Sequence, residues 1–147
     1  MQALLNINDY IVEELTVKGN DAYRKTAKEV QVQVDIAFNA KRKGKEPLFM
    51  ITLIIELNKS KQAFANNAYY VYLKINGFFG FPKETDEETM QKMISLNGLV
   101  MLYGIARGVV AQVTANGAHG KFVLPAVNFV ELVKNSRTKS EAKMKKG

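Results

Sequence analysis

The stretch Leu48-Phe-Met-Ile-Thr-Leu-Ile-Ile-Glu-Leu57 is almost continuously apolar. Only Thr52 and Glu56 interrupt the run. A half-exposed strand alternates apolar and polar residues, whereas a strand covered on both faces is apolar at consecutive positions. The stretch therefore predicts the central strand of a β-sheet, and the segments on either side of it supply the neighbouring strands.

Two predicted strands precede this central one. Apolar residues occupy the even positions of Val30–Phe38 and alternate with polar or small residues, which predicts a strand with one buried and one solvated face. Tyr10–Lys18 mixes β-branched and acidic residues and predicts the first strand, which a Gly-Asn turn signal ends. Asn39–Pro47 is predicted to be a charged loop, with Gly44 as its turn residue.

The fourth predicted strand is Tyr69–Phe81, which follows a polar connection at 58–68. Alternation places Val71, Leu73 and Ile75 on one face of this strand. The opposite face receives Tyr70, Tyr72, Lys74 and Asn76.

Helical signals follow the last strand. Thr85-Asp-Glu-Glu88 fits a capping box and predicts a helix from about Asp86, broken or kinked at Asn97-Gly98. Apolar residues return at helical spacing up to Val113. The sequence then predicts a loop at 116–120, an extended segment at 122–129 and a short helix at 129–134.

These elements predict the α+β class: a four-stranded antiparallel sheet with a long kinked helix and a short C-terminal helix on one face. Residues 1–134 are expected to form one domain, and residues 135–147 a basic, disordered tail. The long helix is apolar around much of its circumference, more than one small sheet can cover. It therefore predicts a homo-oligomer, with an interface at Leu99, Leu102, Tyr103, Ala106 and Val110.

Composition excludes several classes of protein. The 147 residues contain no cysteine and one histidine, which removes thiolate catalysis and metal sites built on sulfur or on several histidines. We expect no cofactor, no metal, no enzymatic activity and no membrane span, and a cytoplasmic location. His119 is interpreted as a loop residue rather than a general base, and the acids at 86–88 as partners of the helix dipole.

The formal net charge of +7 comes from two short segments. The hairpin Lys41–Glu46 carries +3 and the tail 134–147 carries +5, so the rest of the chain carries −1. A basic chain suggests nucleic acid as a partner, but nucleic-acid surfaces interleave basic and aromatic residues on one face. Here the two kinds of residue are apart. Nucleic-acid binding through the hairpin and tail is the alternative function, and solubilising charge is the favoured interpretation.

Aromatic residues gather at the end of the fourth predicted strand, where Phe78, Phe79 and Phe81 follow one another. Half-exposed aromatic side chains beside the glycines 77 and 80 suit the binding of apolar or extended peptide. Plain core packing explains the same residues equally well, so both interpretations stay open.

Two C-terminal motifs carry a family resemblance. Leu102-Tyr-Gly-Ile-Ala-Arg107, followed by Val123-Leu-Pro-Ala-Val-Asn-Phe129, resembles the C-terminal signature of the SecB protein-export chaperone family. Asn76-Gly-Phe-Phe79 is similar to the glycine-containing turn that ends the family's fourth strand. The order of four strands, capped helix, loop and short helix also matches, over about Tyr10–Lys134.

The resemblance implies a cytosolic holdase that works without ATP, assembles as a dimer of dimers and holds unfolded preproteins in long apolar grooves. The grooves lie between the sheet, the crossover after the first strand and the last helix. Residues of this chain that would line such a groove are Tyr23, Phe38, Phe64, Phe78, Phe79, Phe122 and Val127.

The resemblance also implies docking on the SecA motor through outward acids of the sheet, which would place a docking surface at Glu14, Tyr70 and Tyr72. This chain departs from the family there, because Tyr72 stands where the fourth-strand acid would be and the tail is basic. Gly104 and Gly108 replace the family's proline and acid. The departures indicate a changed delivery partner, and a solitary variant dedicated to an antitoxin is one such form.

Overall fold

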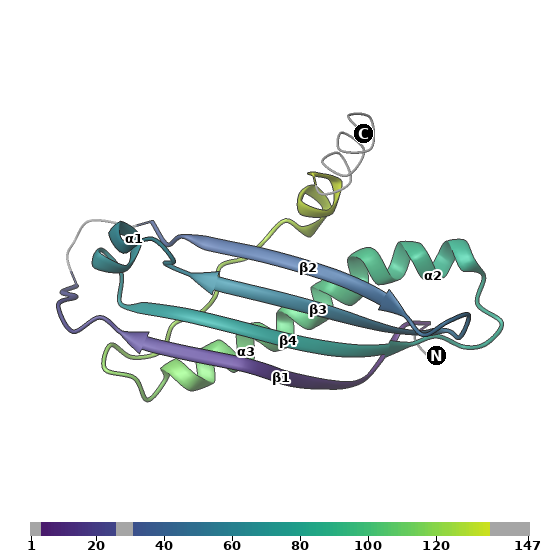
Figure 1. Cartoon of the computed structure of the whole chain (residues 1–147), viewed down its shortest axis with the longest axis horizontal. Coiled ribbons are helices and arrows are strands. Elements are labelled where there is room, and N and C mark those ends of the chain that lie inside the picture. Colours follow the sequence, from purple (N-terminus) through teal and green to yellow (C-terminus); the bar gives the residue numbers. More distant parts are fainter. Residues whose placement is uncertain (1–3, 26–30, 136–147) are drawn as a thin grey trace.

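A four-stranded antiparallel sheet forms the centre of the computed structural model, which describes residues 4–25 and 31–135 (Figure 1). Its strand order is β1-β4-β3-β2. The strands are β1 (Asn6–Gly19), β2 (Val34–Arg42), β3 (Leu48–Leu57) and β4 (Tyr69–Gly80). The central position of β3 and β4 agrees with their apolar sequences, and the predicted α+β class is confirmed.

Helices cover one face of this sheet, and the opposite face is open (Figure 1). α2 (Glu87–Met93), a π-helical turn η1 (Ile94–Gly98) and α3 (Leu99–Thr114) follow one another without interruption. A short α1 (Lys61–Ala65) lies in the connection before β4, which the sequence had indicated only as polar. Residues 129–135 are helical, close to the predicted 129–134.

Alternating residues of β3 and β4 build the core beneath the helices. Phe49, Leu53 and Ile55 lie opposite Phe79, Ile75 and Leu73, and all six side chains are buried. The intervening residues of both strands lie on the open face and are mostly half-buried. We call these two surfaces the helix-covered face and the open face.

The π-helical turn coincides with the predicted break at Asn97-Gly98. A Cβ atom on Gly98 would lie 2.8 Å from Cδ1 of Ile51, so a larger residue here would require the Ile51 side chain to shift. A π-turn rotates the residues that follow it relative to those before it. The turn therefore lets both α2 and α3 present apolar side chains to the same face of the sheet.

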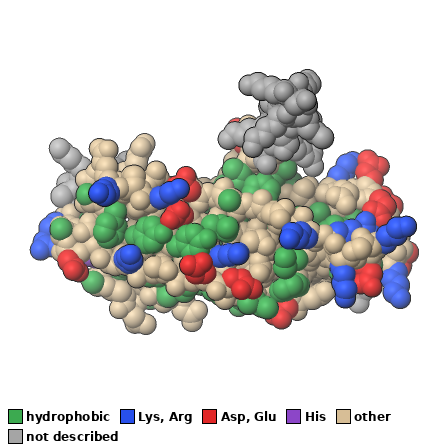
Figure 2. Space-filling view, in the orientation of Figure 1, with side chains coloured by type: hydrophobic (Ala, Val, Ile, Leu, Met, Phe, Trp, Pro, Cys, Tyr) green, Lys and Arg blue, Asp and Glu red, His purple; other side chains and the backbone are tan. Residues whose placement is uncertain are grey.

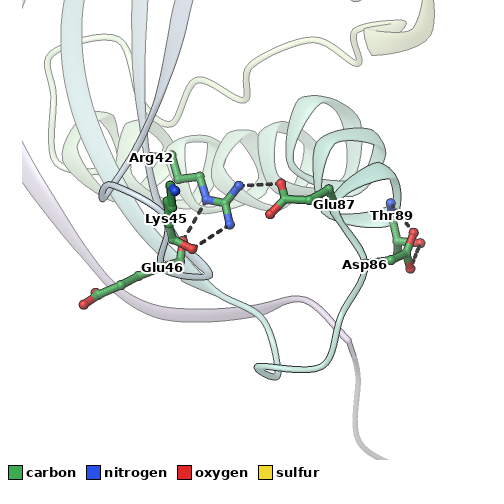
Figure 3. A network of polar contacts seen from close by, with 6 residues as sticks. All are labelled: Arg42, Lys45, Glu46, Asp86, Glu87 and Thr89. Carbon is green, nitrogen blue, oxygen red and sulfur yellow. Dashed lines mark hydrogen bonds and ion pairs between the residues drawn. The ribbon is translucent and has the colours of Figure 1, made fainter.

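The helix begins one residue later than the predicted capping box. Asp86 is the N-cap, and its carboxylate accepts hydrogen bonds from the backbone N (3.2 Å) and Oγ1 (2.7 Å) of Thr89 (Figure 3). Thr85 Oγ1 is buried without a hydrogen-bond partner. The prediction that Thr85 caps the helix is wrong, because Asp86 has the extended backbone that an N-cap needs.

An ion pair joins the first turn of α2 to the β2–β3 hairpin. Arg42 donates to the carboxylate of Glu87 and to the backbone oxygens of Lys45 and Glu46 (Figure 3). Through this contact the Glu87 carboxylate raises the pKa of Arg42, and the guanidinium lowers the pKa of Glu87. One of the hairpin's cations is therefore already neutralised within the fold.

Several strand boundaries differ from the predicted ones. β2 runs from Val34 to Arg42 instead of from Val30 to Phe38, and β1 begins at Asn6 instead of Tyr10. The ends of β1 and β4 each differ by one residue. Polar residues at 39–42 suggested a loop, but they pair in register with β3 as far as Arg42 opposite Phe49. Pairing with the central strand β3 extends β2 through residues 39–42 even though their side chains are mostly polar. The loop shrinks to 43–47, where Gly44 has the expected positive φ of 57°.

The core of the single chain includes every residue predicted for the oligomer interface. Those five side chains are at most 4% exposed beneath the sheet: Leu99, Leu102, Tyr103, Ala106 and Val110. They are corrected to core residues, because the sheet covers this side of the helix. By length and composition the continuous run Glu87–Thr114 could cross a membrane, a test that the core helix of a soluble protein also passes.

Candidate functional site

Asn20 anchors the turn that follows β1. Its side-chain amide donates to the backbone oxygens of Phe64 (2.8 Å), Ala65 (3.3 Å) and Asn67 (3.1 Å). Its backbone N donates to the oxygen of Ala68 at 2.8 Å. The start of the crossover is therefore attached to the connection between α1 and β4. The sequence indicated a turn here but not this buried amide.

His119 completes the same junction from the loop after α3. Its Nε2 lies 2.7 Å from the backbone oxygen of Asn20, and because a carbonyl only accepts, Nε2 carries the proton. The ring contacts Tyr23 and Tyr69 edge-on, with centroids 5.2 Å and 5.8 Å apart. The imidazole holds two loops together, which agrees with its interpretation as a loop residue rather than a general base.

Tyr23 and Phe122 meet in a cavity of about 190 Å³ on the helix-covered side of the molecule. The backbone N of Phe122 donates to Thr114 Oγ1 at 2.8 Å, which fixes the segment after the loop against the end of α3. We call this cavity the Tyr23 pocket; its lining is Tyr23, Val32, Leu57, Asn58, Asn67, Ala68, Tyr69 and Phe122.

A second hollow of about 600 Å³ lies between α3 and residues 126–130. Tyr103 donates its hydroxyl to the backbone oxygen of Pro125, and Arg107 Nε donates to that of Leu124 at 3.1 Å. These bonds hold the extended segment along the helix. We call this hollow the helix groove; its apolar lining includes Leu96, Val100, Met101, Ala126, Val127 and Val130.

The seven predicted groove residues do not form one surface. Tyr23 and Phe122 share the Tyr23 pocket, and Val127 lines the helix groove. Phe38 and Phe64 are half-buried, on β2 and α1. Phe79 is 1% exposed and belongs to the core, so its assignment to the groove is corrected. Phe78 lies on the open face, because neighbouring residues of a strand point to opposite faces.

Glu14, Tyr70 and Tyr72 all lie on the open face. Glu14 lies opposite Lys74, and Tyr72 lies between Thr16 and Glu56. The Tyr70 hydroxyl donates to Oε2 of Glu56 at 2.6 Å. Acids and bases alternate here, so the surface is a charge mosaic rather than an acidic patch. Its use as a docking surface stays a prediction.

The Tyr70–Glu56 contact should be visible by titration. The hydrogen bond to Glu56, partial burial and neighbouring negative charge raise the pKa of Tyr70 to about 12. Because the protonated phenol is favoured in the fold, this stabilisation is present below pH 10.0 and is lost as pH rises through about 12. Glu56→Gln should return the tyrosine pKa toward its ordinary value of 10.0, measured by tyrosinate absorbance. An unchanged titration, with Tyr70→Phe as reference, would contradict the contact.

The described residues contain no group of three or more His, Asp or Glu side chains that could hold a metal ion. In the basic hairpin, the guanidinium of Arg42 is occupied by Glu87. The tail at 136–147 lies outside the described residues, so its predicted disorder and the nucleic-acid alternative stay predictions.

Comparisons with known proteins give one relative by sequence, one similar fold and one matching family. An uncharacterized protein of Methanocaldococcus jannaschii, MJ0357, is 25% identical over 131 residues, 89% of this chain and 83% of that protein. The fold is similar to that of the Mycobacterium tuberculosis Rv1957 SecB-like chaperone, solved with a ChAD peptide from the Rv1956 HigA1 antitoxin. That match has a TM-score of 0.64 and 16% identity over 84% of this chain and 91% of the other. The family model described as preprotein translocase subunit SecB matches residues 1–140, and the chain therefore belongs to the SecB family.

Proposed function

We propose that this protein is an ATP-independent chaperone that holds unfolded polypeptides at the Tyr23 pocket and the helix groove. Membership of the SecB family supports the chaperone class. The observation that carries the site is the presence of two apolar hollows joined by one extended segment, which runs from Phe122 in the pocket to Val127 in the groove.

The dimensions of the Tyr23 pocket suit a side chain of a polypeptide rather than a metabolite. Pockets for small ligands usually exceed about 300 Å³. The Tyr23 pocket, at about 190 Å³, is smaller and suits one apolar side chain. Between the hollows Val123 is 51% exposed, and at the far end of the groove Val130 is 61% exposed. An extended client could place one side chain in the pocket and the next apolar residues along the groove.

The expected affinity of the chaperone for its client is modest, which suits a protein that holds clients reversibly. Burial of one large apolar side chain contributes about 1.5–3 kcal/mol. Ordering the client backbone costs about 1–2 kcal/mol for each fixed residue. A few anchored side chains therefore leave a small surplus, so that the client binds reversibly. Binding the unfolded state lowers its free concentration and slows aggregation without ATP.

Replacing Tyr23 and Phe122 together by serine should reduce the suppression of aggregation several-fold. The double variant removes two of the three aromatic side chains that line the pocket and leaves the buried Tyr69 in place. Light scattering of an unfolded model protein at a few-fold molar excess of chaperone measures the effect. Phe78→Ser, on the open face, is the matched aromatic control and should protect like the wild type. No protection by the wild type would refute the proposal, and equal loss in the control would refute the assignment to the pocket.

We further propose that the chain forms a homo-oligomer through β1. This 14-residue strand is at the edge of the sheet and leaves one row of backbone groups unpaired. Four of its large apolar side chains are at least 36% exposed: Tyr10, Ile11, Val12 and Leu15. A long exposed apolar edge is a template for pairing with another chain. A second copy pairing with this edge would cover these residues.

Charge placed at this edge should separate the subunits. Val12→Lys and Leu15→Lys together should halve the mass measured by light scattering, because an unpaired ammonium would be buried at the interface. Val123→Lys, at a similarly exposed apolar position away from β1, should leave the mass unchanged. A wild-type chain that is monomeric at micromolar concentration would overturn the proposal.

A cytoplasmic location and two classes of client belong to the same proposal. The family description names a preprotein translocase subunit, and the Rv1957 structure contains an antitoxin peptide. The mosaic of charge on the open face supports a delivery partner other than the SecA motor. Identification of the polypeptides that co-purify from the native host would decide between a preprotein and an antitoxin.

A further inference from the structure

A third hollow, of about 450 Å³, lies at one end of the open face, where the β2–β3 hairpin meets the ends of β1 and β4. We call it the end hollow. The buried residues Phe49 and Phe79 of the helix-covered face also line it, but it shares no lining residue with the Tyr23 pocket or the helix groove, so it is separate from the proposed client site. Its lining is Asn8, Lys41, Arg42, Lys43, Leu48, Phe49, Met50, Phe78 and Phe79.

The floor of the end hollow is apolar. Met50 and Phe78 lie directly opposite each other on β3 and β4, and both are half-buried. Leu48 extends this floor toward the hairpin and is also half-buried. Among the residues that the structure describes, no helix covers this face, so the three half-buried side chains have their outer surfaces available to a partner (Figure 1).

The rim of the end hollow is cationic. Lys41 lies opposite Met50 and has no ion pair within the described part of the chain. Lys43 has only a long contact of 3.9 Å with Glu46, at a mostly exposed position. Arg42 is neutralised by Glu87. Figure 2 shows several blue side chains at this end of the molecule, with red ones among them.

One acidic residue, Asp9, lies on β1, on the side of the end hollow opposite the hairpin. Asp9 pairs with Phe78 across β1 and β4, and its Oδ1 accepts a hydrogen bond from the backbone N of Tyr10 at 2.8 Å. It does not line the hollow. The two lysines therefore set the sign of the charge that faces a ligand on the floor.

We propose that the end hollow docks an extended acidic segment of a partner protein, with an aliphatic side chain on Met50 and Phe78 and flanking carboxylates at Lys41 and Lys43. Charge complementarity selects this occupant. The chain's own tail carries a net +5 and would be repelled. Single-stranded nucleic acid stacks its bases on successive aromatic side chains, and this floor presents one half-buried aromatic beside Met50 and Leu48.

The probe is a synthetic labelled peptide with a Leu-Leu pair flanked on both sides by glutamates, titrated into the full chain by fluorescence anisotropy. Lys41→Glu with Lys43→Glu should weaken its binding by about tenfold or more. Lys59→Glu with Lys61→Glu makes the same change in net charge at exposed positions away from the hollow and from β1, and this variant should bind within about twofold of the wild type. Circular dichroism of both variants verifies that they fold.

Two control peptides test the two parts of the occupant. Serines in place of the leucines should weaken binding because the floor is no longer covered. Lysines in place of the glutamates should abolish binding. The methyl NMR signal of Met50 should shift with the acidic peptide, and that of Met101 in the helix groove should not.

The proposal is overturned if the charge-reversed pair of lysines binds the peptide like the wild type. It is also overturned if the serine peptide, or single-stranded DNA, binds as tightly as the acidic peptide, since the hollow would then be a site for any polyanion. A shift at Met101 instead of Met50 would assign the peptide to the helix groove. Aggregation suppression by Lys41→Glu with Lys43→Glu should be unchanged, so failure here leaves the proposed function standing.

Discussion

Leu102→Ala is expected to lower the free energy of unfolding by about 3–5 kcal/mol, the range for truncating a fully buried leucine that leaves a cavity. Leu102 is 0% exposed, and its Cδ1 would lie 2.9 Å from a Cβ on Gly77, so its methyl group fills the space that this glycine leaves on β4. The neighbouring side chains belong to a rigid sheet and cannot collapse into the cavity. Urea denaturation measures the loss.

Val100→Ala is the matched control on the same helix. Val100 is 47% exposed and faces away from the sheet, so its truncation should change stability by less than about 0.5 kcal/mol. Equal effects at the two positions would contradict the placement of Leu102 in the core. An effect of Leu102→Ala on subunit mass alone, with unchanged folding stability, would restore the interface role that its helical spacing first indicated.

Asn20→Asp is expected to lower the free energy of unfolding by about 3 kcal/mol or more. The substitution replaces an amide that donates to three backbone oxygens with a carboxylate that only accepts. Asn20 is 7% exposed, so water cannot compensate for the lost bonds or for the new charge. The connection before β4 should loosen, with faster amide exchange at 63–68.

The loss of folding stability caused by Asn20→Asp, called the deficit below, should depend on pH. A carboxylate facing carbonyl oxygens is disfavoured in the fold, so the pKa of the new side chain is raised above its unfolded value of about 3.9. Its protonated form is therefore favoured in the folded state, and the deficit should shrink as pH falls toward 4. Asn39→Asp, at an exposed position of β2, should change stability by less than about 0.5 kcal/mol at any pH in this range. A pH-independent deficit would contradict the carbonyl cluster.

Local patterns predicted β3 and β4 accurately. The apolar run of β3 matches the observed Leu48–Leu57, and the alternation of β4 placed Val71, Leu73 and Ile75 on one face as observed. The period of two in a strand follows from its backbone geometry, which depends on neighbouring residues only. The helix break at Asn97-Gly98 was also predictable, because glycine is a poor helix former.

Features that depend on a distant partner were predicted poorly. The sequence of 39–42 is polar, yet pairing with β3 extends β2 through it. The sequence predicted Thr85 as the N-cap of α2, and the structure has Asp86. Both residue types can cap a helix, and the extended backbone of Asp86, which decides between them, is not visible in the sequence. The assignment of Phe79 to a groove failed because the helix covers the face on which it lies.

For the candidate sites, residue types were sufficient to name aromatic side chains, but the sequence assigned Phe78 and Phe79 to the same groove, and the structure places them on opposite faces of β4. Residue types and spacing could not show which face the helices cover, since the pattern of β4 is compatible with either a core or a groove on each side. Contacts between distant segments settle that question: Asn20 with 64–67, His119 with Asn20, and Lys41 with the floor at Met50 and Phe78. Such contacts form only when the whole sheet and its helices pack together, because no period along one strand encodes them.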